Sequence, residues 1–340
     1  MRLLNNIYYI YWHVICKKLI MKKILSILSI FILISSTQSC SNNDEDYIME
    51  PQTILNIIDE SMNYTFLAYS LKETNLADVL DGADKYTLMA PSNMAFREFL
   101  MQNGFNSIDE VPKNLLKQIL LNHVMPGVLE YRDIETGYYK SAATSEASLT
   151  PLSIYIKQVN MRVTINGESR ITQGNVRANN GIIHAVSSVI PLPSLVTFVT
   201  ADANLSNLTA ALTRKDLSVD FVTTLSSKNG MSSAPFTVFA PTDQAFIDLL
   251  VELGIQSLSD IDEPTLKATL NHHLIEDTNA LSTDLSDNLQ LNTLGGPITA
   301  NITGGATITD GNNRISKIIA VDIQATNGVI HVIDKVILPN

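Results

Sequence analysis

Cysteine, tryptophan and long apolar segments are scarce in this chain. Only two cysteines, Cys16 and Cys40, occur among 340 residues, which excludes a scaffold held together by several disulfides. Trp12, the single tryptophan, lies in the predicted signal, and aromatic residues make up 6% of the chain, which weighs against a site that stacks sugars. The apolar run at residues 24–34 is well short of the roughly 20 residues that a transmembrane helix needs.

Recognisable catalytic, cofactor and metal motifs are also lacking. The sequence contains no His-Glu-x-x-His, no EF-hand loop, no Cys-x-x-Cys and no Gly-x-Ser-x-Gly elbow. His272 and His273 are adjacent on a predicted helix, where neighbouring side chains point about 100° apart and cannot readily hold one ion together. We therefore predict no catalytic residue, no cofactor, no metal and no enzymatic activity.

Residues 1–40 have the order of an export signal. Lysines after Met21 precede the apolar run at 24–34, and small residues then lead to Cys40. This order resembles a bacterial lipoprotein signal, in which the cysteine is acylated and becomes the mature N-terminus, although Thr37 stands where such signals favour leucine. A plain secretory signal with an unrelated cysteine is the alternative. Because the signal is complete from Met21, the true start codon is either Met1 or Met21.

The predicted mature chain is strongly acidic. Removing the five basic residues of the signal leaves 18 basic against 34 acidic side chains, a formal charge of −16, which disfavours a nucleic-acid partner. Residues 41–50 form an acidic tether. Acidic residues just after a lipidated cysteine resemble the tag of lipoproteins displayed on some Gram-negative cells, so we expect a surface-exposed outer-membrane lipoprotein. Display in the periplasm is the alternative.

The chain after the tether is duplicated. The segment 86–96 returns 150 positions later as 236–246, and 116–124 returns at the same offset as 266–274. Asn180-Gly-Ile-Ile-His184 returns as Asn327-Gly-Val-Ile-His331 at an offset of 147. Three blocks in the same order indicate two tandem globular domains, because solenoid repeats are much shorter. We assign them to residues 51–193 and 195–340, and the short linker suggests that they touch.

Each repeat starts with helical periodicity and ends with strand periodicity. Segments 54–58, 93–101 and 113–123 have helical spacing, with Ser92 as an N-cap, whereas 152–157 and 162–165 alternate between apolar and polar residues. In the second repeat Thr242 or Asp243 offers the same cap, and the extra residues near 213–234 are interpreted as a loop insertion. Helices followed by strands, without β-α-β alternation, predict an α+β fold.

The duplicated blocks resemble the signatures of fasciclin (FAS1) domains. Segments 236–246 and 327–339 are very close to the two signatures, and the segments that end at His123 and His273 match the block between them. The resemblance implies two wedge-shaped β-sandwiches with packed N-terminal helices, and a role in extracellular adhesion. The animal adhesion motif places a tyrosine before the middle histidine; Asn122 and His272 stand there, so that recognition is not implied. The motif residues expected to be structural are Pro91, Phe96, His123, Gly181, His184, Pro241, Phe246, His273, Gly328 and His331.

Two functional hypotheses follow for a lipid-anchored pair of such domains. The first is a non-catalytic adhesion or interaction protein whose partner is an extracellular protein or glycan. The alternative is a glycan- or small-ligand-binding accessory lipoprotein of the outer membrane or periplasm. Tyr131, Tyr138 and Tyr139 are the aromatic grouping that could contact such a ligand, and packing within strands and loops is their competing interpretation.

Overall fold

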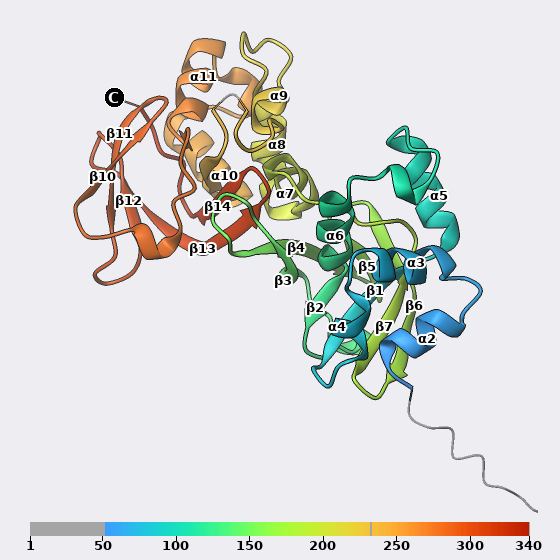
Figure 1. Ribbon diagram of the computed structural model, residues 1–340. Coiled ribbons are helices and arrows are strands. Elements are labelled where there is room, and N and C mark those ends of the chain that lie inside the picture. The colour runs from blue at the N-terminus through green and yellow to red at the C-terminus, as the bar shows by residue number, and fades with distance from the viewer. Residues whose placement is uncertain (1–51, 232, 340) are drawn as a thin grey trace, which may run out of the picture. The chain divides into compact units, whose positions relative to one another are not determined.

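The computed structural model describes residues 52–231 and 233–339. The predicted signal, Cys40 and the acidic tether lie outside the described residues. Within them the chain passes twice through the same order, helices first and strands afterwards, as the colours from blue to green and then from yellow to red show in Figure 1. This order confirms the predicted α+β fold class.

The helices fall into two matching groups. In the first repeat they are α2 (Ile54–Glu60), α3 (Thr65–Glu73), α4 (Ala77–Asp81), α5 (Asn93–Gln102) and α6 (Lys113–Asn122). In the second they are α7 (Leu195–Ala201), α8 (Ser206–Leu212), α9 (Phe221–Leu225), α10 (Asp243–Leu253) and α11 (Glu263–Asn271). Short 3-10 turns are η1 (Ile108–Glu110), η2 (Tyr131–Asp133), η3 (Ala203–Leu205), η4 (Leu258–Asp260) and η5 (Ser282–Asp284).

Side-chain caps fix where the longer helices begin. Ser92 Oγ accepts a hydrogen bond from Ala95 N at 3.3 Å at the start of α5, as predicted. At the start of α10 the cap is Thr242, whose Oγ1 accepts from Ala245 N at 3.2 Å. Asp243 has another role, because its Oδ1 accepts from Asn207 N at 2.7 Å and so ties α10 to α8.

The strands of each repeat form one seven-stranded sheet. The first repeat contains β1 (Tyr86–Pro91), β2 (Val124–Pro126), β3 (Gly137–Thr144), β4 (Pro151–Val159), β5 (Arg162–Ile165), β6 (Ser169–Ala178) and β7 (Gly181–Val186). The second contains β8 (Phe236–Pro241), β9 (Leu274–Ile275), β10 (Leu289–Thr293), β11 (Gly296–Asn301), β12 (Thr307–Thr309), β13 (Ile315–Ala325) and β14 (Gly328–Ile333). The strand orders are β2-β1-β7-β6-β5-β4-β3 and β10-β11-β12-β13-β14-β8-β9.

Bulges bend the long strands β6 and β13, so that each strand takes part in both layers of its sandwich. β1 pairs with β7, and β8 with β14, in parallel, while the other neighbours are antiparallel. The pairing of β6 with β7 slips between Ile171 and Gln173 and again before Val176, and β13 slips twice against β14. Such bulges bend a strand, so the sheet can fold over onto itself.

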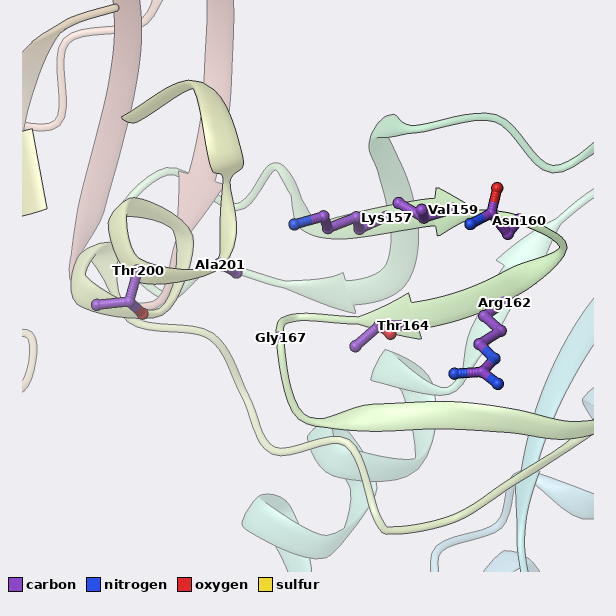
Figure 2. Close-up of a pocket in the computed structure, with 8 residues that line it drawn as sticks. All are labelled: Lys157, Val159, Asn160, Arg162, Thr164, Gly167, Thr200 and Ala201. Atoms are coloured by element: carbon purple, nitrogen blue, oxygen red, sulfur yellow. The ribbon is translucent and has the colours of Figure 1, made fainter. Parts of the chain in front are cut away.

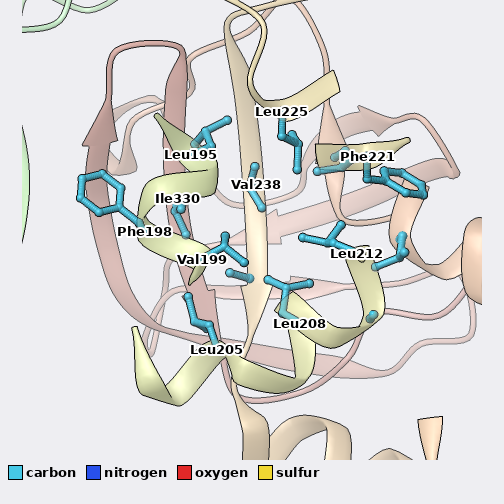
Figure 3. Close-up of a cluster of buried hydrophobic side chains, with 14 of the residues drawn as sticks. Leu195, Phe198, Val199, Leu205, Leu208, Leu212, Phe221, Leu225, Val238 and Ile330 are labelled. Atoms are coloured by element: carbon cyan, nitrogen blue, oxygen red, sulfur yellow. The ribbon is translucent and has the colours of Figure 1, made fainter. Parts of the chain in front are cut away.

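Each repeat buries two hydrophobic clusters. The one between the sheet layers contains Ile154, Ile156 and Ile165 in the first repeat and Ile298 and Ile308 in the second. The other lies between the helices and the sheet, and Figure 3 shows it for the second repeat, where side chains of α7, α8 and α9 meet those of β8 and β14.

The strand β4 departs from the predicted alternation. Leu152, Ile154 and Ile156 are buried as expected, but Ser153 and Tyr155, which point to the other face, are only 1% and 2% exposed. Their face is covered because Tyr155 belongs to the helix-side cluster of the second repeat. A strand expected to be half-buried is therefore buried on both faces by contact between the repeats.

Candidate functional site

Two equivalent histidines end helices α6 and α11. His123 Nδ1 donates to Ile119 O at 2.7 Å, and its Nε2 accepts from Ile190 N at 2.8 Å. His273 repeats this with Thr269 O at 2.7 Å and Ile337 N at 3.0 Å. Burial lowers the pKa of each ring to about 4, more than the carbonyl contact raises it. Both rings are therefore neutral links between a helix end and the segment after the last strand.

A second equivalent pair lies on the central strands β7 and β14. His184 Nε2 donates to Leu129 O, and His331 Nε2 donates to Ala280 O, both at 2.8 Å. Burial lowers the pKa of both rings. His184 Nδ1 also accepts from Asn175 N at 3.2 Å, whereas His331 Nδ1 is buried without a partner. The geometry gives these rings backbone contacts and brings no nucleophile to them.

The remaining motif residues shape the same framework. Pro91 and Pro241 close strands β1 and β8, and Phe96 and Phe246 are buried on helices α5 and α10. Gly181 and Gly328 begin β7 and β14, where they pair with Tyr86 and Phe236 of the parallel neighbours. A Cβ on Gly181 would stand 2.0 Å from Tyr86 O, and one on Gly328 would stand 2.2 Å from Phe236 O. Only glycine fits at these two positions.

Two asparagines that begin the last duplicated block of each repeat connect distant segments. Asn180 Oδ1 accepts from Ile54 N at 2.8 Å, and its Nδ2 donates to Leu80 O at 2.7 Å and Gly82 O at 2.9 Å. Asn327 makes the equivalent bonds to Leu195 N, Leu225 O and Ser227 O at 3.0, 2.7 and 2.9 Å. Each amide therefore holds the first helix and the end of the third helix against the last hairpin.

The three candidate tyrosines do not form one aromatic face. The rings of Tyr131 and Tyr139 pack against the cluster between the sheet layers, and Tyr131 Oη donates to Met161 O. Tyr139 Oη donates to Glu135 O at 3.0 Å. Tyr138 points to the other side of β3, where its ring lies 5.0 Å from that of Tyr155 and 5.6 Å from that of Phe198.

Hydrogen bonds join the two repeats at this place. Tyr138 Oη donates to Asp202 Oδ2 at 2.9 Å, and burial together with this carboxylate raises the pKa of the phenol. Lys140 Nζ donates to Asp322 O at 2.6 Å. Ser153 Oγ accepts from Gln324 N at 2.9 Å. The predicted contact between the repeats is confirmed, and it consists of specific polar bonds around the buried Tyr155.

Gln324 is the centre of this junction. Its amide is fully buried, and Oε1 accepts from Ser148 Oγ at 3.1 Å in the first repeat. In the second repeat Nε2 donates to Asn279 Oδ1 at 2.8 Å and to Gly328 O at 2.9 Å. One side chain therefore satisfies buried polar groups of both repeats, which the sequence alone gave no means of finding.

A pocket of about 770 Å³ lies beside the junction. In Figure 2 its walls are Lys157 on β4, Arg162 and Thr164 on β5, and Thr200 on α7 of the second repeat. Gly167 lets the two repeats approach here, because a Cβ would lie 3.3 Å from Ala201 Cβ and its φ is +77°. No lining residue is acidic or aromatic, so the pocket is a basic and polar surface.

Metal ligands and membrane-spanning helices are not found in the part of the chain that the structure describes. No group of three histidine, cysteine or carboxylate side chains there could hold a metal ion. Within residues 52–231 and 233–339 no helix combines the length and apolarity that crossing a bilayer requires.

Comparison with known proteins identifies the family to which this chain belongs. The fasciclin domain matches residues 62–193 and 203–339, so the chain belongs to the fasciclin domain family and contains two tandem copies of that domain. A FAS1 domain pair from the insect cell adhesion molecule fasciclin I has a similar structure, with a TM-score of 0.46 and 20% identity over 79% of this chain and 92% of that one.

Particular relatives come from fungi, animals and bacteria. The chain is 26% identical over 275 residues to a fasciclin-like arabinogalactan protein of Arthroderma benhamiae and 27% identical over 273 residues to human periostin. These alignments cover 77% and 78% of this chain but only 61% and 30% of the relatives, which are longer. An uncharacterized protein of Synechocystis is 34% identical over 151 residues, which is 43% of this chain and 98% of that protein.

Proposed function

We propose that this chain is a non-catalytic adhesion or interaction protein, held at the bacterial outer membrane by a lipid on Cys40 and displayed on the cell surface. The observation that carries the proposal is the pair of fasciclin domains, at 62–193 and 203–339, and it is supported by the predicted signal that leads to Cys40. Fasciclin domains are typically adhesion and interaction modules, and the partner class that fits is an extracellular protein or glycan.

The arrangement of the titratable groups supports a binding role. The four motif histidines bond to backbone atoms, and burial keeps their pKa values below the ordinary value, so none is poised to exchange protons near neutral pH. Binding then falls to the surface of a rigid scaffold, as is common for loop and sheet faces.

Protease shaving of intact expressing cells tests the location. We expect added protease to remove the protein from intact cells, and the Cys40→Ala variant to escape to the medium or periplasm because it lacks the acyl chains. Cys16→Ala is the matched control, since it removes the other thiol and leaves the acylation site unchanged; it should be displayed as the parent chain is. Protection of the parent chain until the outer membrane is permeabilised would refute surface display.

A second candidate is the glycan- or small-ligand-binding accessory lipoprotein. The basic pocket at the junction favours it, because a concave polar surface suits a small ligand better than a flat protein partner. Protection from shaving would leave this candidate ahead, with the protein in the periplasm.

A further inference from the structure

Three cations share one face of the first repeat's sheet. Lys157 on β4 pairs with Thr164 on β5, and Thr164 pairs with Arg170 on β6. Arg162 lies two residues before Thr164 on the same strand, so its side chain leaves the same face. We call Lys157, Arg162 and Arg170 the basic face; Lys157 is half-buried and both arginines are exposed.

The cations of the basic face form no ion pair within the described residues: none of the pairs found there includes Lys157, Arg162 or Arg170. Lys157 and Arg170 flank Thr164 from its two neighbouring strands, so like charges are gathered on one face of the sheet without being directly opposed. An anion bound among them would reduce the repulsion between these like charges.

The duplicated scaffold does not need these charges. The corresponding row of the second repeat is Asn301, Thr307 and Lys317, which pair across β11, β12 and β13 in the same way. Gly305 stands three residues before Ile308, as Arg162 stands three before Ile165. The second repeat therefore carries one cation at the positions where the first repeat carries three, so the charge cluster belongs to the first repeat alone.

The lining of the pocket selects the kind of anion. Thr164, Asn160 and Thr200 offer hydroxyl and amide groups beside the cations, which suits a ligand with both hydroxyls and a negative charge. No aromatic ring is present to stack a neutral sugar. The formal charge of −11 repels long, dense polyanions such as nucleic acid. A volume of about 770 Å³ is ample for a small ligand.

We propose that the basic face and its pocket bind the carboxylate groups of short acidic oligosaccharides that contain uronic acid units. Lys157 and Arg162 would pair with the carboxylates, Arg170 would add to the positive potential, and the polar lining would accept the sugar hydroxyls. The inference rests on the proposed interaction function and names the ligand class for it. Since α7 forms one wall, the site requires both repeats in their observed contact.

Calorimetry on the purified full-length chain in neutral detergent tests the site. The probes are trigalacturonate, a glucuronate-containing tetrasaccharide, neutral maltotriose and sodium sulfate. We expect saturable, salt-sensitive binding of the uronates, none of maltotriose, and weak or no binding of sulfate. Lys157→Gln and Arg162→Gln should each weaken uronate binding at least about tenfold, because each removes a charge-assisted bond to a carboxylate.

Lys317→Gln is the matched control, since it removes the same charge from the corresponding row of the second repeat. It should leave uronate affinity unchanged. Equal weakening by Lys317→Gln would show a general charge effect and overturn the site. So would sulfate that binds as tightly as the uronates, or the absence of saturable binding for both uronates. These results do not depend on the lipid anchor, so failure here is distinct from failure of surface display.

Discussion

Acidification from pH 7 to pH 5 should destabilise this fold through its buried histidines. His123 and His273 are buried and neutral, with pKa values of about 4 against an ordinary value of 6.5. The unfolded chain therefore binds protons at these two sites between pH 6.5 and pH 4, while the folded chain does not. Stability is fully present above pH 6.5 and is lost as the pH falls toward 4.

The size of the loss follows from those two pKa values. At pH 5 the difference in proton binding is worth about 2 kcal/mol for each ring, so the free energy of unfolding should fall by about 4 kcal/mol between pH 7 and pH 5. The structural reason is that Nε2 of each ring accepts a backbone N–H, from Ile190 or Ile337, and protonation would set a second donor against it. His184 and His331, whose pKa values are also lowered, act in the same direction.

Urea denaturation, followed by far-ultraviolet circular dichroism at a series of pH values, measures the free energy of unfolding as a function of pH. Carboxylates such as Asp220 and Asp287 have lowered pKa values, so their contribution is lost only below about pH 4, outside the window. His123→Gln and His273→Gln should be less stable at pH 7. Each should also remove about half of the decrease in unfolding free energy between pH 7 and pH 5 that is attributed to the two rings. A free energy that is constant within about 1 kcal/mol from pH 7 to pH 5 would refute the reasoning, as would an unchanged slope in the double variant.

Two further predictions concern buried amides. Gln324→Ala should lower stability by about 3 kcal/mol, because buried groups of both repeats, including Ser145 Oγ and Gly328 O, lose their partner. The exposed Gln290→Ala should change stability by less than about 0.5 kcal/mol in the same denaturation assay. Asn327→Ala should also cost about 3 kcal/mol, since three buried backbone groups are left unpaired, and a loss below about 1 kcal/mol would contradict its role in holding the helices.

Local patterns in the sequence predicted most of the framework. The caps Ser92 and Thr242 and the helical periodicity placed α5 and α10, because these signals depend on neighbours within one or two turns. The duplicated blocks likewise revealed two domains of one family. Period-two alternation found the strands and the face that points between the sheet layers.

Contacts made over long sequence distances were beyond the same patterns. The alternation in β4 could not show that Ser153 and Tyr155 are covered, because the covering residues belong to the other repeat. The segment interpreted as a loop insertion contains α9, whose Phe221 and Leu225 are buried, so that interpretation was wrong for these residues. The sequence patterns also did not predict the basic face, since its three cations are brought together only by strand pairing.

The core of the second repeat is completed by Tyr155, a side chain that its own sequence does not supply. Cutting the chain at the linker would expose Tyr155 on one fragment, and on the other it would remove Tyr138 from beside Phe198. The boundary between the repeats in the sequence is thus not a boundary in the hydrophobic core, and the two domains are best handled as one piece.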